Sequence, residues 1–333
     1  MFSLMMPSTT WFLVVVFVIG LAALVKGADW LVDGASDLAK RLGVSDLMIG
    51  LTVVAFGTSM PEFIVNMASV STNATDLAIT NVLGSNTVNT LVILGCSALV
   101  YPIFAKKETV RFDVPLNIIG GILVLLFLRM RLGGEPMNGL SRMEGGLFLL
   151  VFACFLFYSI KSAKSVIPDS ADSKTSIWRC ILFVVIGLVS LVFGGELVVR
   201  SATAIAKQAG ISESIIGLTI VALGTSLPEL ATSVMATFKR NSDIAIGNVV
   251  GSNVFNVFFI LGTSALVRPL PAYQGIELDA FLVAFSATVV WLLLITNKKR
   301  SINRWGGALL LIVYAIYLSF RLGAWNNILN LIR

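Results

Sequence analysis

Long apolar stretches alternate with short polar connections along the whole chain. A spanning helix needs about 20 mostly apolar residues. By this criterion the sequence predicts ten spans, at residues 11–35, 44–71, 77–101, 113–132, 142–161, 178–206, 211–238, 244–267, 279–296 and 303–322. The first stretch follows an uncharged N-terminus, so we interpret it as a retained helix and not as a cleaved signal peptide. The pattern predicts an all-α polytopic membrane protein with ten transmembrane helices.

The second half of the chain repeats the first at a spacing of 167 residues. The motif GTSMPE at 57–62 returns as GTSLPE at 224–229, and residues 43–102 align with 210–269 without a gap and with identity at half of the positions. Because each half holds an odd number of spans, the second half enters the membrane from the opposite side. We therefore expect two inverted five-helix repeats, over residues 1–165 and 166–333.

Basic residues are divided unequally between the two sides of this arrangement. The connections that follow the odd-numbered spans carry fifteen Lys and Arg residues, and the other side carries seven. The more basic side of a membrane protein is usually cytoplasmic. The sequence therefore predicts a multi-pass protein of the cell inner membrane with both termini outside the cytoplasm.

Composition restricts the chemistry that the chain can support. The chain is 57% hydrophobic and only 13% charged, and it contains no His. His-ligated zinc, haem and His-based acid/base catalysis are therefore excluded. The three cysteines fall within or beside apolar spans, and we interpret them as small buried hydrophobes. The net charge of +6 comes from short loops between spans, so it indicates topology and not a nucleic-acid partner.

Each copy of the repeated motif places a proline and a glutamate inside an apolar span. Pro61 and Pro228 remove a backbone donor, so we expect the helix to be interrupted there. Glu62 and Glu229 are costly at this depth, at about 2.5–3.5 kcal/mol each on insertion scales. No basic residue lies in the same stretches to neutralise them. A cation site built from both repeats therefore accounts for these residues better than a simple kink or a buried ion pair does.

Polar side chains at helical spacing accompany each glutamate. Thr58 and Thr225 lie four residues before Glu62 and Glu229, so each pair shares a helix face. The next spans carry a polar residue every four positions, namely Asn81, Ser85 and Asn89 in the first repeat and Asn248, Ser252 and Asn256 in the second. One such stripe would serve to hold helices together, but four matching polar helices favour a shared site. All the ligands are oxygen atoms, which suit hard cations such as Ca²⁺, and Na⁺ uses the same atoms.

Two further acidic residues, Asp29 and Glu196, correspond at the repeat spacing. The sequence leaves open whether they line an ion path or lie near a helix end. Asp33 and Asp37 have no acidic counterparts and are expected at the membrane interface.

The repeated motifs, Gly-Thr-Ser-x-Pro-Glu followed by Asn-Val-x-Gly-Ser-Asn, resemble the two α-repeats of the cation/calcium antiporter superfamily, and most of all its prokaryotic sodium/calcium exchangers. The resemblance covers nearly the whole chain. It implies a core of the second, third, seventh and eighth helices, with long first and sixth helices that slide across it. It also implies exchange of several Na⁺ for one Ca²⁺ by alternating access. The partners would be these two ions and the lipid bilayer, and neither a cofactor nor a protein partner is implied.

The resemblance also assigns roles to individual residues. Glu62 and Glu229 would be the Ca²⁺ carboxylates. The other ligands would be the backbone carbonyls of Thr58, Thr225, Ala55 and Ala222, the hydroxyls of Ser59, Ser226, Ser85 and Ser252, and the side chains of Asn89 and Asn256. Some relatives, the potassium-dependent exchangers among them, have Asp where this chain has Asn256, which argues against K⁺ co-transport here.

Three other functions compete with sodium/calcium exchange. A Ca²⁺/H⁺ or other cation/H⁺ antiporter of the same fold is the alternative, although its Gly-Asn-x-x-Glu motif is the poorer match. An ion channel is disfavoured because a channel needs an open path of rings or carbonyls, whereas these repeats build one occluded site. An intramembrane enzyme is disfavoured because Glu62 and Glu229 have no hydrolytic partner.

Overall fold

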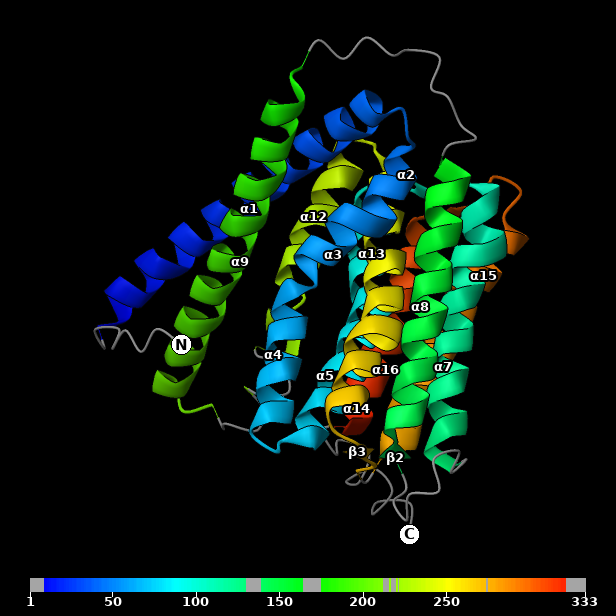
Figure 1. Ribbon diagram of the computed structural model, residues 1–333. Helices are drawn as coiled ribbons and strands as arrows, with labels where there is room; N and C mark the ends of the chain where they lie inside the picture. The colour runs from blue at the N-terminus through cyan, green and yellow to red at the C-terminus, as the bar shows by residue number, and fades with distance from the viewer. Residues whose placement is uncertain are drawn as a thin grey trace.

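The computed structural model describes residues 9–129, 139–163, 175–211, 222–273 and 275–321, together with residues 216 and 220. Most of them are helical (Figure 1). The first half contains α1 (Thr10–Leu42), α2 (Asp46–Ile49), η1 (Gly50–Val54), α3 (Ala55–Thr58), α4 (Met60–Ser71), α5 (Thr75–Thr87), η2 (Val88–Ile93), α6 (Leu94–Val100), η3 (Thr109–Asp113), α7 (Val114–Arg129) and α8 (Arg142–Ala163). The second half contains α9 (Ile177–Gln208), α11 (Ala222–Gly224), α12 (Leu227–Phe238), α13 (Ser242–Val254), η5 (Phe255–Leu261), α14 (Gly262–Val267), α15 (Ile276–Thr296) and α16 (Arg304–Arg321).

These helices follow the ten expected spans. Within the described residues, seven helices are long and apolar enough to cross a membrane, and the bent pair 46–58 and 60–71 makes an eighth span with a bend of 44°. The span expected at 211–238 contains α11 and α12, although residues 212–215, 217–219 and 221 lie outside the described part. The span expected at 303–322 corresponds to α16.

The helix α1 extends beyond its expected end at residue 35. It continues through a polar turn to Leu42 and stops at Gly43, which adopts a left-handed conformation with φ of 66°. Glycine takes this conformation without a steric penalty, so a helix commonly ends there. The added turns carry Asp37, Lys40 and Arg41.

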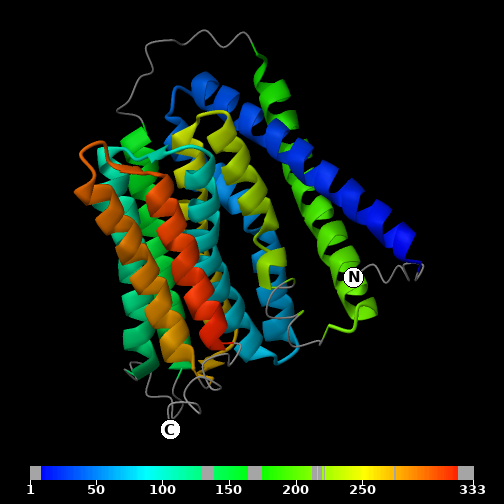
Figure 2. The same ribbon diagram turned by 180° about the vertical axis from the view of Figure 1, so that it is seen from behind.

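The helices α1 and α9 cross each other beside the remaining helices (Figures 1 and 2). Glycines make this crossing close. A Cβ added to Gly27 would lie 2.9 Å from the carbonyl oxygen of Gly187, and one added to Gly20 would lie 2.9 Å from that of Gly194. Small residues let helix backbones approach in this way in membrane proteins. The two helices therefore pack as one pair.

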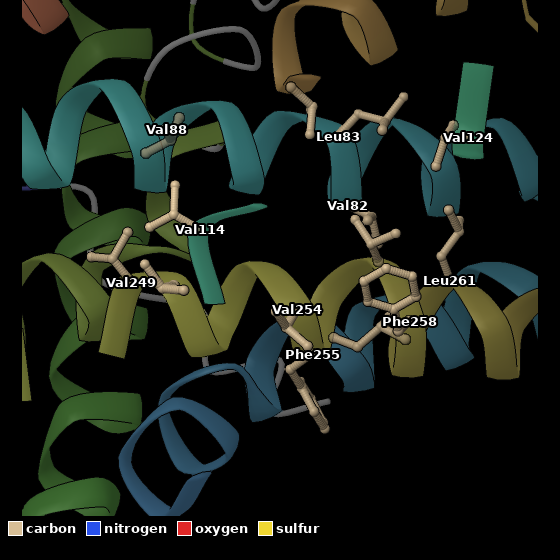
Figure 3. Close-up of a cluster of buried hydrophobic side chains, with 14 of the residues drawn as sticks. Val82, Leu83, Val88, Val114, Val124, Val249, Val254, Phe255, Phe258 and Leu261 are labelled. Carbon is tan, nitrogen blue, oxygen red and sulfur yellow. The ribbon is translucent and has the colours of Figure 1, made fainter. Parts of the chain in front are cut away.

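The remaining helices form a compact bundle around α5–α6 and α13–α14. Side chains from α5, α7, α13 and η5 meet in its apolar core, part of which Figure 3 shows. Phe258 lies at the centre of this core and makes an edge-to-face contact with Phe148 of α8, at 5.7 Å between ring centroids. This packing holds the third and eighth spans, which carry the polar stripes, in the middle of the molecule.

Two short antiparallel ladders connect the halves of the chain. β1 (Ile103–Phe104) pairs with β4 (Ser301–Ile302), and β2 (Gly139–Leu140) pairs with β3 (Leu270–Pro271). The sequence did not predict them, because strands of two residues leave no detectable alternation. Each ladder joins a connection of the first half to one of the second.

Candidate cation-binding site

Both halves interrupt a helix at the serine of the repeated motif. Ser59 separates α3 from α4 with φ of −84° and ψ of 6°, and Ser226 precedes α12 with φ of −91° and ψ of 7°. The prolines then fall in the first turn of α4 and α12, where a missing N–H breaks no intrahelical bond. Glu62 and Glu229 lie in the same first turns, where the helix dipole favours negative charge. The predicted interruptions are present, and each places its glutamate at the start of a helix.

Each glutamate accepts a hydrogen bond from the broken-helix serine of the other repeat. Ser59 Oγ donates to Glu229 Oε1 at 2.8 Å, and Ser226 Oγ donates to Glu62 Oε1 at 3.3 Å. Both glutamates are fully buried. Within the described residues, no Lys or Arg forms an ion pair with either carboxylate. The structure thus brings both carboxylates to one place and gives them no cationic side chain.

The first break is also in contact with the eighth span. Ser252 Oγ lies 3.4 Å from Glu229 Oε1 and 3.5 Å from the carbonyl oxygen of Ala55. Thr58 Oγ1 contacts the same carbonyl at 3.3 Å and Asn248 Oδ1 at 3.1 Å. The structure therefore gathers four of the expected site residues, Ala55, Thr58, Glu229 and Ser252, around one break.

The asparagines of the polar stripes fall into two groups by their hydrogen bonding. Asn81 donates to the carbonyl oxygen of Glu62 at 3.4 Å, and Asn248 donates to that of Glu229 at 3.3 Å. These bonds hold the glutamate backbones. By contrast, both side-chain polar atoms of Asn89 are buried without a partner within the described residues. Asn256 donates to Asn86 at 3.0 Å and leaves its Oδ1 unpartnered.

Residues that sequence reasoning did not place in the site position these stripes. Asn86 donates to the carbonyl oxygen of Asn253 at 3.1 Å, and Asn253 donates to Thr90 Oγ1 at 2.8 Å. Asn66 accepts a bond from Asn81 at 2.7 Å, and Ser233 accepts one from Asn248 at 2.9 Å. The duplication was a usable signal for four of these residues, since Asn86 and Asn253 belong to the repeated Gly-Ser-Asn and Ser233 occupies the position that corresponds to Asn66.

The asparagines Asn89 and Asn256 lie on π-helical turns. Asn89 is in η2 and Asn256 is in η5, at equivalent places in the two repeats. A π-turn widens the helix locally and re-aims its side chains, and such turns are frequent at functional sites. Sequence periodicity does not reveal this feature, because both spans are buried on most faces and have no exposed polar face whose position could be followed along the helix.

Several buried oxygens in these segments have no hydrogen-bond partner among the described residues. They include Glu62 Oε2, Glu229 Oε2, Ser85 Oγ, Thr225 Oγ1, Asn89 Oδ1 and Asn256 Oδ1. Buried polar oxygens usually have a partner, so such a set needs an explanation. Carboxylate, hydroxyl and amide oxygens are the ligands of hard cations. Ala222, the remaining expected ligand, lies at the start of α11, but its side chain is outside the described part.

Comparisons with known proteins agree with this geometry. The chain matches the sodium/calcium exchanger protein family over residues 12–161 and 179–323. It is 37% identical over 310 residues to the putative antiporter CaxA of Alkalimonas amylolytica, covering 90% of this chain and 95% of that protein. It is 31% identical over 339 residues to the sodium/calcium exchanger MaX1 of Methanosarcina acetivorans, covering 91% and 96%. These matches confirm the resemblance carried by the repeated motifs.

A solved structure shares the fold. The sodium-calcium exchanger NCX_Mj, soaked with 10 mM Na⁺ and zero Ca²⁺, matches with a TM-score of 0.81 and 30% sequence identity, covering 93% of this chain and 99% of that one. The ten-helix inverted-repeat architecture expected from the sequence fits this fold. The chain therefore belongs to the sodium/calcium exchanger family and is a multi-pass membrane transporter, not an enzyme.

Proposed function

We propose that the protein is a secondary antiporter that exchanges Na⁺ for Ca²⁺ across the membrane by alternating access. The observation that carries the proposal is the pair of buried glutamates, bonded reciprocally to Ser59 and Ser226 and lacking a basic partner within the described residues. Two carboxylates neutralise one divalent ion. The names of the relatives CaxA and MaX1 and of NCX_Mj support an antiporter and these two ions.

The proposed site draws on both repeats, which we assign to residues 1–165 and 166–333. Glu62 and Glu229 bind Ca²⁺ near the middle of the membrane. The other ligands that we propose for Ca²⁺ and Na⁺ are Thr58, Thr225, Ser59, Ser226, Ser85, Ser252, Asn89, Asn256, Ala55 and Ala222. The unpartnered oxygens of this set support the assignment, because a cation would satisfy them. Since the two ions use the same kinds of oxygen, they compete for the site.

Proton coupling is the second candidate. A carboxylate that is fully buried with one oxygen unpartnered could equally carry a proton, so Glu62 and Glu229 also fit a Ca²⁺/H⁺ or other cation/H⁺ antiporter. Sodium coupling has the better support, because the motif and the names of the relatives agree on it. We further propose that the protein lies in the cell inner membrane with both termini outside the cytoplasm, from the distribution of Lys and Arg.

The test is uptake of ⁴⁵Ca²⁺ into proteoliposomes loaded with Na⁺. We expect uptake when the outside solution contains choline in place of Na⁺, since Na⁺ then leaves down its gradient. Vesicles with a K⁺ gradient or a pH gradient alone should take up no more than protein-free vesicles. Uptake that follows the pH gradient and ignores Na⁺ would support the proton-coupled alternative.

A further inference from the structure

The helix pair α1–α9 contacts the core unequally at its two ends. Leu31, Val32 and Ala35 of α1 belong to a buried apolar cluster that also contains Ala236 of α12. Within the described residues, α4, which is the counterpart of α12 in the first repeat, contributes no member to this cluster. The C-terminal end of α9 instead lies apart from the bundle in both views (Figures 1 and 2). The pair is therefore packed against the core at the end where α12 meets α13, which we call the Lys239 side.

A lysine beside this cluster holds α1 to the core. Lys239 follows α12 directly, and its ammonium lies 2.6 Å from Asp29 Oδ1 and 2.7 Å from Asp33 Oδ1, both on α1. It also donates to the carbonyl oxygen of Asp29 at 3.1 Å. Burial lowers the pKa of Lys239, but its hydrogen bonds to Asp29 and Asp33 outweigh this effect and raise the pKa above its ordinary value. Lys239 is therefore charged at physiological pH.

A second residue of the same turn supports the contact. Asn241 donates to Ser36 Oγ on α1 at 2.9 Å and to Asp46 Oδ2 on α2 at 2.6 Å. Lys239 and Asn241 thus join α1 to the connection between α12 and α13. Their partners lie on successive helical turns of α1. Because α12 begins at the proposed site with Glu229, the contact links the position of α1 to that helix.

The other half of the molecule carries no equivalent contact in its described part. At the spacing of 167 residues, the counterparts of Asp29, Asp33, Ser36, Lys239 and Asn241 are Glu196, Arg200, Thr203, Thr72 and Ala74. Glu196 and Arg200 pair with each other along α9 at 2.5 Å. The Thr72 hydroxyl donates to the carbonyl oxygen of Ala68 in its own helix. The Thr203 hydroxyl is buried and has no hydrogen-bond partner in the part of the chain that the structure describes. The repeats are therefore alike at the site but different at this contact.

We propose that Lys239, Asp29 and Asp33 are positioning residues for transport, which keep the Lys239 side closed by fastening α1 to the α12–α13 turn. The proposal rests on the alternating-access function given above. It assigns Asp29 and Asp33 to an ion pair within the protein and not to an ion path. Opening the Lys239 side would break both ion pairs of Lys239.

The test measures access to a reporter beneath the contact. Thr232 lies on α12 between Glu229 and Lys239, is fully buried, and has a hydroxyl without a partner among the described residues. Thr232→Cys is made in a background in which the three native cysteines are replaced, and a membrane-impermeant thiol reagent is applied to one face at a time. Lys239→Met should raise the labelling rate from the Lys239 side about fivefold or more, the factor that about 1 kcal/mol of lost stabilisation produces. Lys298→Met, which removes an exposed lysine from another loop of the same side, should leave the rate unchanged.

Further variants separate the ion pair from a general loss of structure. Lys239→Arg should keep labelling slow. The double variant Asp29→Asn with Asp33→Asn should equal Lys239→Met, and adding Lys239→Met to it should change nothing more, as expected for residues of one network. The proposal would be overturned if Lys239→Met were labelled at the same rate as Lys298→Met. It would also be overturned if the effects of the aspartate and lysine changes were additive. Since labelling needs no transported ion, its outcome is separate from that of the Ca²⁺ uptake test.

Discussion

Ser59 in the first half of the chain donates a 2.8 Å hydrogen bond to Glu229 in the second. The bond from Ser226 to Glu62 is its counterpart, longer at 3.3 Å. Each serine is the residue at which its own helix breaks, so the break of one repeat is bonded to the carboxylate of the other. Neither carboxylate has its environment completed by its own repeat.

Removing one carboxylate charge should abolish Ca²⁺ transport. We expect Glu62→Gln and Glu229→Gln each to reduce Na⁺-driven ⁴⁵Ca²⁺ uptake more than a hundredfold. A unit charge about 4 Å away contributes about 4 kcal/mol at an effective dielectric of 20. Glu108→Gln, which neutralises an exposed glutamate directly before η3, is the control and should transport normally. Near-normal uptake by either site variant that elutes as a folded protein would refute the site assignment.

Ser59, the serine at the first helix break, should contribute to Na⁺ binding. Ser59→Ala removes a proposed Na⁺ ligand and leaves Glu229 Oε1 without its shortest hydrogen bond. We expect the Na⁺ concentration for half-maximal exchange to rise several-fold, with a smaller change for Ca²⁺. Ser71→Ala is the matched control, because Ser71 ends the same helix α4 and bonds only to the carbonyl of Met67 there. Equal Na⁺ dependence in the two variants would count against a role for Ser59.

The crossing of α1 and α9 should tolerate no side chain. A Cβ at Gly27 would lie 2.9 Å from the carbonyl oxygen of Gly187, so Gly27→Val forces the helices apart. Overpacking of this kind typically costs about 1–3 kcal/mol, and we expect a lower midpoint of thermal unfolding in detergent. Gly146→Val on α8 provides the comparison, because an added Cβ there meets no atom within 4 Å. Matching midpoints for the two variants would show that the crossing is not this tight.

Transport should respond to membrane potential and should not need K⁺. Exchange of several Na⁺ for one Ca²⁺ moves net charge, which is worth about 2.3 kcal/mol per charge per 100 mV. The chain has an amide, Asn256, at the position where the resemblance implies a carboxylate for potassium-dependent exchange. Uptake of ⁴⁵Ca²⁺ into Na⁺-loaded vesicles at several valinomycin-set potentials tests the first expectation. For the measurement without K⁺, the membrane potential is set with a proton ionophore in place of valinomycin. A requirement for K⁺ under these conditions would contradict the expectation that transport does not need K⁺.

Both termini should be accessible from outside the cytoplasm. The expectation follows from the fifteen basic residues on one side and seven on the other. A single cysteine in a tag at either end, in a background without native cysteines, should react with an impermeant reagent in intact cells. Reaction only in inverted vesicles would show that the termini lie in the cytoplasm and would refute this topology.

Much of the fold could be predicted from the sequence because the bilayer imposes strong patterns. Span length, the duplicated motif and the prolines 61 and 228 predicted ten helices, inverted halves and two broken helices, and the structure and its match to NCX_Mj confirm this architecture. The carboxylates Glu62 and Glu229 were also predicted to come together, and each accepts a hydrogen bond from the serine of the other repeat. These features depend on local composition and on the repeat.

Features that depend on tertiary geometry could not be predicted in this way. The π-turns at Asn89 and Asn256 change the direction of side chains by a shift that periodicity does not resolve. The ion pairs of Lys239 with Asp29 and Asp33 join residues more than 200 positions apart, and the repeat did not reveal them because its other copy lacks them. Whether Asp29 lined an ion path was therefore open from sequence alone.

The cross-repeat ladders β1–β4 and β2–β3 have a consequence for biosynthesis. The ribosome completes the first strand of each ladder long before its partner, and the same order holds for Glu62 and Ser226. A nascent chain that stops after α8 holds a carboxylate in the membrane with no serine from the other repeat to bond it. The first half is thus inserted with a polar surface around Glu62 that still lacks its partner from the second half. Only the full-length chain buries it.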